Sequence, residues 1–92
     1  MDTFKYKAFL KVAETGSMGK AAEKLNYTQP AITYIIRSLE KELGTQLMSR
    51  AYNGVSLTQA GNEILPIAKR LLECESDLES KMSELKLQGV IS

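Results

Sequence analysis

Apolar residues recur at helical spacing in the first half of the chain and predict three helices there. The first covers residues 3–13 and is followed by Gly16, which can close a helix in the left-handed conformation. The second covers residues 18–25 and begins behind Ser17, a favourable N-cap. The third covers residues 28–43. The short turn between the second and third helices is the signature of a helix-turn-helix.

The helix predicted over residues 28–43 has one apolar and one polar face. Its buried stripe is predicted to consist of Ile32, Ile36, Leu39 and Leu43. The side chains predicted on the outward face, with Gln29 at its N-terminal edge, are those of Pro30, Thr33, Tyr34, Arg37 and Lys41. Most helices expose a polar face, so polarity alone indicates no function. The segment Thr-Gln-Pro-Ala over residues 28–31 is unusual for generic surface and suits close approach to a groove.

Two short strands, over residues 46–50 and 55–57, follow the third helix. Asn53-Gly54 between them is a strong hairpin signal. A hairpin directly behind a helix-turn-helix is a wing, although a purely structural hairpin is the alternative. Arg50 and Asn53 favour the wing, because their side chains can reach a phosphate or a minor groove.

A last helix is predicted behind the cap Thr58 and ends before Gly89. Its 29 residues would extend roughly 43 Å, whereas a compact chain of this size has a radius of gyration of about 12 Å. The helix must therefore protrude and pair with a partner. Heptad spacing, broken only by Glu75, predicts that a homodimer forms through Ile64, Ala68, Leu71, Leu78, Met82 and Leu85. The heptads leave parallel and antiparallel pairing open.

The composition describes one globular domain of 92 residues and 10.2 kDa, with 43% hydrophobic and 25% charged residues. No histidine and a single cysteine argue against a usual zinc site and a histidine-based triad, so we expect no enzyme, metal or cofactor. No apolar run reaches the length of about 18 residues that a membrane span needs. The N-terminus lacks the pattern of a signal peptide, and the lone cysteine suits a reducing compartment, so we expect a cytoplasmic protein.

Charge is unevenly distributed along the chain. Residues 1–57 hold eight Lys and Arg against five Asp and Glu, a net charge of +3, and residues 58–92 carry −2. A basic front can meet phosphates, although scattered solvated charge explains the same numbers. The alternative to nucleic-acid binding is therefore a winged helix that binds protein. A small enzyme is the third class, and no nucleophile–base pair or pair of carboxylates is placed by a motif to support it.

Residues 16–44 (GSMGKAAEKLNYTQPAITYIIRSLEKELG), 47–50 (LMSR) and 57–61 (LTQAG) resemble the winged helix-turn-helix of LysR-type transcriptional regulators. The resemblance implies a mainly α fold: three helices and a two-stranded β-hairpin wing over residues 1–58, followed by a linker and dimerisation helix over residues 59–88. It also implies a bacterial DNA-binding regulator that recognises an imperfect inverted repeat. The family usually dimerises antiparallel through the linker helix, and a tetramer is expected for a full-length protein. The family's effector-binding domain is absent from these 92 residues.

The resemblance also assigns roles by position. Gln29 and Pro30 match the Gln-Pro that opens the family's recognition helix, and Thr33 stands where Ser is usual. Tyr34 stands where Arg is common, which removes a guanine reader. Further departures are Ile35 for Gln, Met48 for Phe and Ser56 for a basic residue. The residues predicted to contact DNA are Ser17, Thr28, Gln29, Pro30, Thr33, Tyr34, Arg37, Lys41, Arg50 and Asn53.

Overall fold

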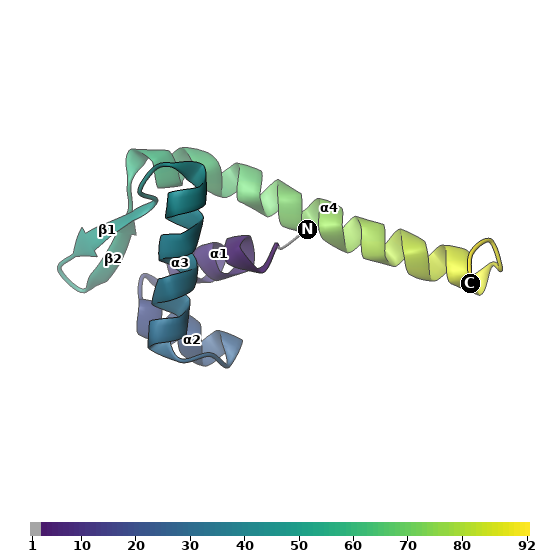
Figure 1. The fold of residues 1–92 in the computed structure, drawn as a ribbon, viewed down its shortest axis with the longest axis horizontal. Helices are drawn as coiled ribbons and strands as arrows, with labels where there is room; N and C mark the ends of the chain where they lie inside the picture. The colour runs from purple at the N-terminus through teal and green to yellow at the C-terminus, as the bar shows by residue number, and fades with distance from the viewer. Residues whose placement is uncertain (1–2) are drawn as a thin grey trace.

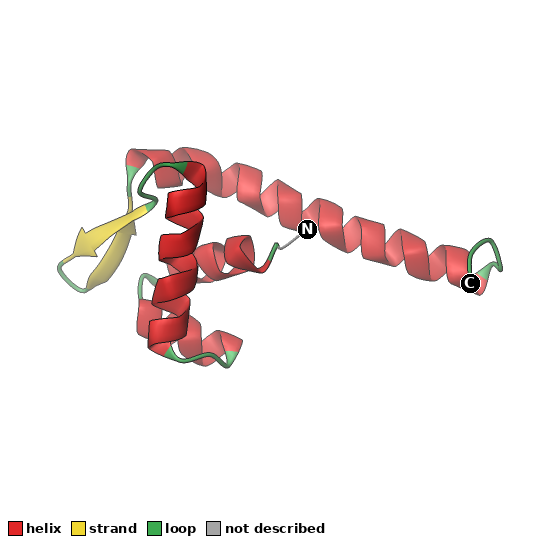
Figure 2. Ribbon diagram, in the orientation of Figure 1, coloured by secondary structure: helices red, strands yellow, loops and turns green. Residues whose placement is uncertain are grey.

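The computed structural model describes residues 3–92 and shows a mainly helical domain with one long projecting helix (Figures 1 and 2). Its elements, in chain order, are α1 (Phe4–Thr15), α2 (Met18–Leu25), α3 (Gln29–Leu43), β1 (Met48–Ala51), β2 (Gly54–Leu57) and α4 (Gln59–Leu87). The predicted fold class, a winged helix-turn-helix followed by a long helix, is confirmed. Residues 1 and 2, with which the first predicted domain begins, lie outside the described residues.

Three of the helices, α2, α3 and α4, start where their predicted N-caps lie. In each case a hydroxyl oxygen accepts a hydrogen bond from the backbone N–H three residues later, which satisfies a donor that the helix leaves unpaired. The donors are Lys20 for Ser17 (3.1 Å), Ala31 for Thr28 (3.3 Å) and Gly61 for Thr58 (3.0 Å). Gly16 and Gly44 close α1 and α3 in the left-handed conformation. Local sequence signals therefore place most helix ends correctly, although α1 begins one residue later and ends two residues later than predicted.

The wing is displaced by one or two residues from its predicted position. Met48 pairs with Leu57 and Ala51 with Gly54, so Tyr52 and Asn53 form the turn that was predicted at Asn53-Gly54. The first strand begins two residues later than predicted. The N–H of Leu47 donates to the Glu40 carboxylate (2.7 Å) and therefore forms no hydrogen bond with the second strand.

The core lies where α1, α2 and α3 meet, and the wing and α4 close it. The buried apolar residues are Ala8, Phe9, Val12, Ala21, Ala22, Ile32, Ile36, Leu39, Leu47, Met48 and Ala68. The prediction that Leu43 completes the buried stripe of α3 is wrong, because its side chain is 38% exposed. Leu43 lies in the last turn of α3, which extends past the core. Ile35, one of the departures from the family pattern, is partly buried and packs against the core.

The long helix α4 has a packed half and a projecting half (Figure 1). The radius of gyration is 15.5 Å and the longest extent 53 Å, well above a compact domain of this size. The projection predicted from helix length is thereby confirmed. Among the described residues, no helix combines the length and apolar character needed to cross a membrane.

In the packed half of α4, two residues predicted for the dimer seam lie against the domain's own core. Ala68 is 1% exposed and belongs to the protein's own core, and Ile64 packs against that core. Gly61 approaches the wing so closely that a Cβ atom would overlap the Leu47 carbonyl oxygen. Glu75, which interrupts the heptads, accepts a hydrogen bond from the Thr3 hydroxyl. Ile64 and Ala68 therefore pack within the domain itself.

Candidate nucleic-acid interface

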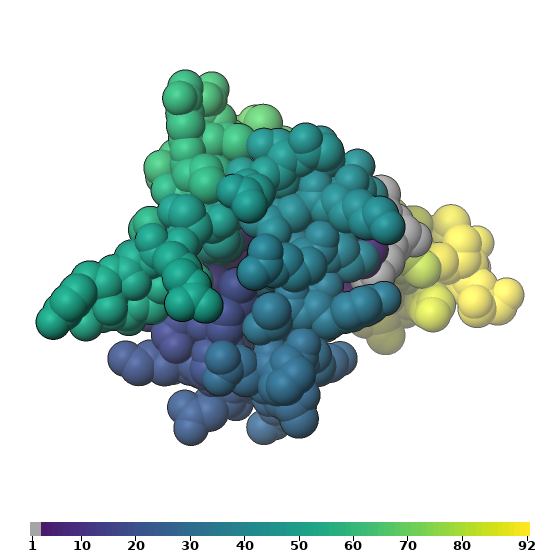
Figure 3. Space-filling model, turned by 60° about the vertical axis from the view of Figure 1, so that its left-hand side comes forward, coloured from purple at the N-terminus to yellow at the C-terminus, as the bar shows by residue number. Residues whose placement is uncertain are grey.

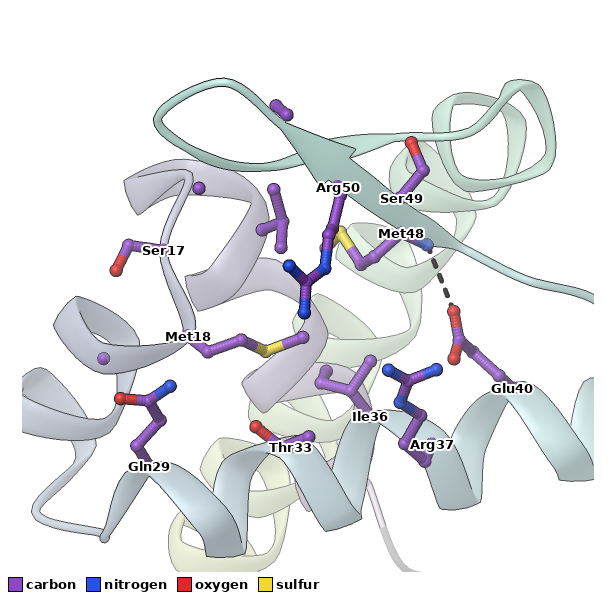
Figure 4. A pocket seen from close by; sticks show the side chains of 14 residues that line it. Ser17, Met18, Gln29, Thr33, Ile36, Arg37, Glu40, Met48, Ser49 and Arg50 are labelled. Carbon is purple, nitrogen blue, oxygen red and sulfur yellow. Dashed lines mark hydrogen bonds between the residues drawn. The ribbon is translucent and has the colours of Figure 1, made fainter.

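A groove of about 540 Å³ lies between the N-terminus of α2, the outward face of α3 and the wing (Figure 4). The wing stands out from the helices at the left of the surface in Figure 3, so the groove opens to solvent. The structure brings together, in the lining of this groove, the side chains of Ser17, Gln29, Thr33, Arg37 and Arg50. These residues come from three separate elements, and only the tertiary fold makes them neighbours.

The other residues predicted to contact DNA surround the groove without lining it. They are Thr28, Pro30, Tyr34, Lys41 and Asn53, and all are exposed. Tyr34 is 74% exposed on α3. It lies one turn after Pro30 and nearly one turn before Arg37, so these three side chains share one outward ridge. The interface therefore consists of a groove and a ridge along the same helix.

Two arginines face each other across the groove. Arg37 extends from α3 and Arg50 from β1, and both guanidinium groups point into the groove (Figure 4). Within residues 3–92, the ion pairs engage other cations, namely Lys5, Lys11 and Lys81. Both guanidinium groups therefore remain available to an anion, and a phosphate is the anion that arginine recognises best in nucleic acids.

Glu40 fixes the wing to α3 at the floor of the groove. Its side chain is almost fully buried, and one carboxylate oxygen accepts hydrogen bonds from the N–H groups of Leu47 (2.7 Å) and Met48 (3.1 Å). The dashed line in Figure 4 marks the bond to Met48. Sequence reasoning missed this residue, although its position four residues after Ile36 places it on the buried side of the helix. Glu40 therefore holds the start of β1, which carries Arg50, against α3, which carries Arg37.

The far end of the wing is fixed as well. The N–H of Val55 donates to the carbonyl oxygen of Gly16, in the turn between α1 and α2, over 3.0 Å. Gly54 has φ 142°, and a Cβ atom there would overlap that same carbonyl oxygen. Only glycine fits this contact. The wing is thus attached to the helices at both ends, and the groove has rigid walls.

A helix-turn-helix with an attached wing and two unpaired arginines across one groove defines a winged-helix domain of the nucleic-acid-binding class. Residues 5–62 match the family described as "Bacterial regulatory helix-turn-helix protein, lysR family". The chain belongs to this family, and its fold is that of a LysR-type DNA-binding domain. The predicted family membership is thereby confirmed.

Individual relatives agree with this assignment. The chain is 46% identical over 72 residues to the HTH-type transcriptional regulator HdfR of Escherichia coli O139:H28, an alignment that covers 78% of this chain and 26% of HdfR. The chain therefore spans about a quarter of the length of such relatives.

Solved structures of relatives superpose closely on this chain. The CbnR DNA-binding domain in complex with DNA is 36% identical with a TM-score of 0.87, covering 94% of this chain and 99% of that one. Vibrio fischeri DarR in complex with DNA is 30% identical with a TM-score of 0.90, covering 96% of this chain and 30% of DarR. The likeness thus extends over nearly all of this chain.

Proposed function

We propose that this chain binds double-stranded DNA sequence-specifically as the DNA-binding portion of a transcriptional regulator. The observation that carries the proposal is the groove in which Arg37 and Arg50 face each other beside the N-terminal half of α3. In this arrangement α3 enters the major groove, and one sugar–phosphate strand lies between α3 and the wing. CbnR and DarR, whose structures hold DNA, support it by their close superposition.

The residues divide between base reading and phosphate contact. Gln29 and Pro30 stand at the tip of α3, where a glutamine amide can bond a base edge and a proline ring can touch a thymine methyl group. Thr33 and Tyr34 follow on the same face. The contacts that position the protein on the phosphates are assigned to Ser17, Thr28, Arg37, Lys41, Arg50 and Asn53. The hydroxyls of Ser17 and Thr28 accept cap bonds from the backbone and retain their O–H donors.

The two parts of the chain have separate tasks in this proposal. Residues 1–58 form the winged helix-turn-helix, and residues 59–88 form the linker helix. Two copies pair through the apolar side chains of α4 that the domain's own core leaves uncovered. Among these, Leu78 and Met82 are exposed, and Leu71 and Leu85 are half-buried. Ile67, which the heptads did not include, is 55% exposed one turn before Leu71 and joins this surface.

The assembled dimer would recognise an imperfect inverted repeat, because two-fold symmetry of the protein matches two-fold symmetry of the site. We infer antiparallel pairing, and a tetramer for a full-length protein, as the resemblance to LysR-type regulators implies. We place this regulator in the bacterial cytoplasm, where the DNA is, and assign it no catalytic activity and no cofactor.

Selection of bound duplexes from a random DNA pool tests the proposal directly. Enrichment of one motif in two inverted copies, with binding that weakens steeply as salt rises, is the expected result. A pool that remains unenriched would reject the proposal. In that case the protein-binding winged helix is the better interpretation.

A further inference from the structure

The tip of the wing carries an aromatic side chain to which none of the roles above applies. Tyr52 and Asn53 are the two residues between the paired Ala51 and Gly54. The side chain of Tyr52 is 100% exposed, so its ring packs against nothing in the described chain. The other tyrosines with large exposure, Tyr27 and Tyr34, lie on or beside helices.

The position of the tip is set by the rest of the domain. The Val55–Gly16 hydrogen bond and the close approach of Gly54 to Gly16 attach the end of the hairpin to the helices. A tyrosine on such a base has two side-chain torsions to fix on binding, so a contact there loses little conformational entropy. The tip is therefore a preorganised contact element.

The groove shows what the tip would face. Ala51 and Gly54 line the same groove as Gln29 and Thr33 of α3, so Tyr52 lies just beyond the wing side of that groove. This step rests on the proposed function: one DNA strand occupies the groove while α3 occupies the major groove. The minor groove lies on the other side of that strand. The tip is therefore directed toward the minor groove that flanks the site of α3.

The side chains at the tip indicate which DNA atoms it would contact. Residues 51–56 read Ala-Tyr-Asn-Gly-Val-Ser and hold no charge, so the Tyr52 side chain has no cationic neighbour within the tip that would draw it to a phosphate. A phenol ring can contact sugar atoms, and its O–H can donate to the acceptors N3 of adenine and O2 of thymine. At a G·C pair the guanine 2-amino group stands in the way. We infer that Tyr52 is a specificity-determining residue that favours A·T pairs in the flanking minor groove.

Three duplexes test this inference with the 92-residue chain. Each holds the motif selected from the random pool and differs at the flanking pairs, which are A·T, I·C or G·C. An I·C pair presents the minor-groove pattern of A·T and the major-groove pattern of G·C, because hypoxanthine lacks the 2-amino group. The wild-type chain is expected to bind the A·T and I·C duplexes equally and the G·C duplex about tenfold more weakly.

The variant Tyr52→Ala is expected to bind the A·T duplex about tenfold more weakly than wild type and to bind all three duplexes alike. Leu87→Ala is the matched control, since it also truncates an exposed apolar side chain, 90% exposed, at the far end of α4. It should retain wild-type affinity and preference. Equal thermal unfolding of both variants and wild type verifies that neither change disturbs the fold.

Salt dependence supplies a second readout. Tyr52→Ala should leave the slope of log K against log salt unchanged, whereas Arg50→Ala should reduce it by about one. A Tyr52→Ala slope lowered by one, wild-type affinities in that variant, or an undiminished G·C penalty would each overturn the inference while leaving the proposed function intact. A wild-type chain that enriches no DNA would defeat the proposed function itself, and the inference with it.

Discussion

Glu40 shows how one side chain controls the geometry of the interface. Its carboxylate accepts two backbone N–H groups that precede and begin β1, and these groups have no strand partner to replace it. Charge-assisted hydrogen bonds of this kind are stronger than neutral ones. The residue thus fastens the start of β1, the strand of Arg50, to α3, the helix of Arg37.

Replacing Glu40 by alanine is expected to lower the free energy of unfolding by about 3 kcal/mol, because two buried N–H groups lose their acceptor. Glu40→Gln retains an acceptor oxygen and should lose about 1 kcal/mol. Urea denaturation measures both values. The control Glu42→Ala removes an exposed carboxylate that pairs with Lys5 at 3.4 Å, and we expect a change below about 0.5 kcal/mol. Equal losses at both positions would contradict the role of Glu40.

Gln29 is the residue whose substitution tests base reading. Because its amide stands at the tip of α3, Gln29→Ala is expected to weaken binding to the selected site about tenfold and binding to random DNA much less. Fluorescence titration with both duplexes measures the two losses. The control Glu63→Ala changes an exposed polar residue of α4 outside the groove and should leave the ratio unchanged. Equal losses of affinity for both duplexes would indicate that Gln29 contacts phosphates rather than bases.

At the scale of elements, the wing and α4 are joined by several backbone contacts. Thr58 caps α4 and also donates from its hydroxyl to the Gln46 carbonyl oxygen (2.7 Å), while its N–H donates to Leu47 (3.0 Å). Gly61 lies one turn further, against the same backbone. The strand end and the helix start therefore form one unit, which fixes the direction in which α4 projects.

The variant Gly61→Ala is expected to destabilise the domain by about 1–3 kcal/mol, because the added Cβ atom and the Leu47 carbonyl oxygen cannot occupy the same space. Gly19→Ala is the matched control within α2, where the nearest atom is the flexible Gln29 amide oxygen at 3.4 Å. It should preserve stability or raise it by up to about 1 kcal/mol, since alanine favours the helix. A melting temperature lower for Gly19→Ala than for Gly61→Ala would refute this packing.

At the scale of the whole molecule, the shape demands a partner. The half of α4 beyond Glu75 leaves the domain, and its apolar stripe lies open at Leu78 and Met82. Apolar side chains at i, i+4 and i+7 along one protruding helix are stabilised when a second helix covers them.

The wild-type chain is expected to sediment as a dimer and the double variant Leu71→Asp with Leu78→Asp as a monomer, because two charges would be buried in the seam. Ser76→Asp with Ser83→Asp adds the same charges at the same spacing on another side of the helix, and this variant should remain dimeric. Sedimentation equilibrium separates the two states. A dimer that survives the first pair of substitutions would show that the interface lies elsewhere.

Two departures from the predicted structure have a tertiary cause. The tip of the wing falls on Tyr52-Asn53 because Gly54 is needed at the contact with Gly16. Ala68 continues the heptads in sequence but faces the core, since α4 rests on the domain before it projects. Neither feature can be predicted from the residues adjacent in sequence, because each depends on contacts with parts of the chain far away in sequence.

The sequence by itself determined the order of the elements, the helix caps and the outward face of α3, because these depend on interactions within a few residues of the chain. Its motifs also identified the LysR family. Only the tertiary structure decided that Arg50 faces Arg37, that Glu40 holds them in place, and which apolar residues of α4 remain for a partner. These features depend on contacts between residues distant in sequence, and such contacts exist only once the core has formed.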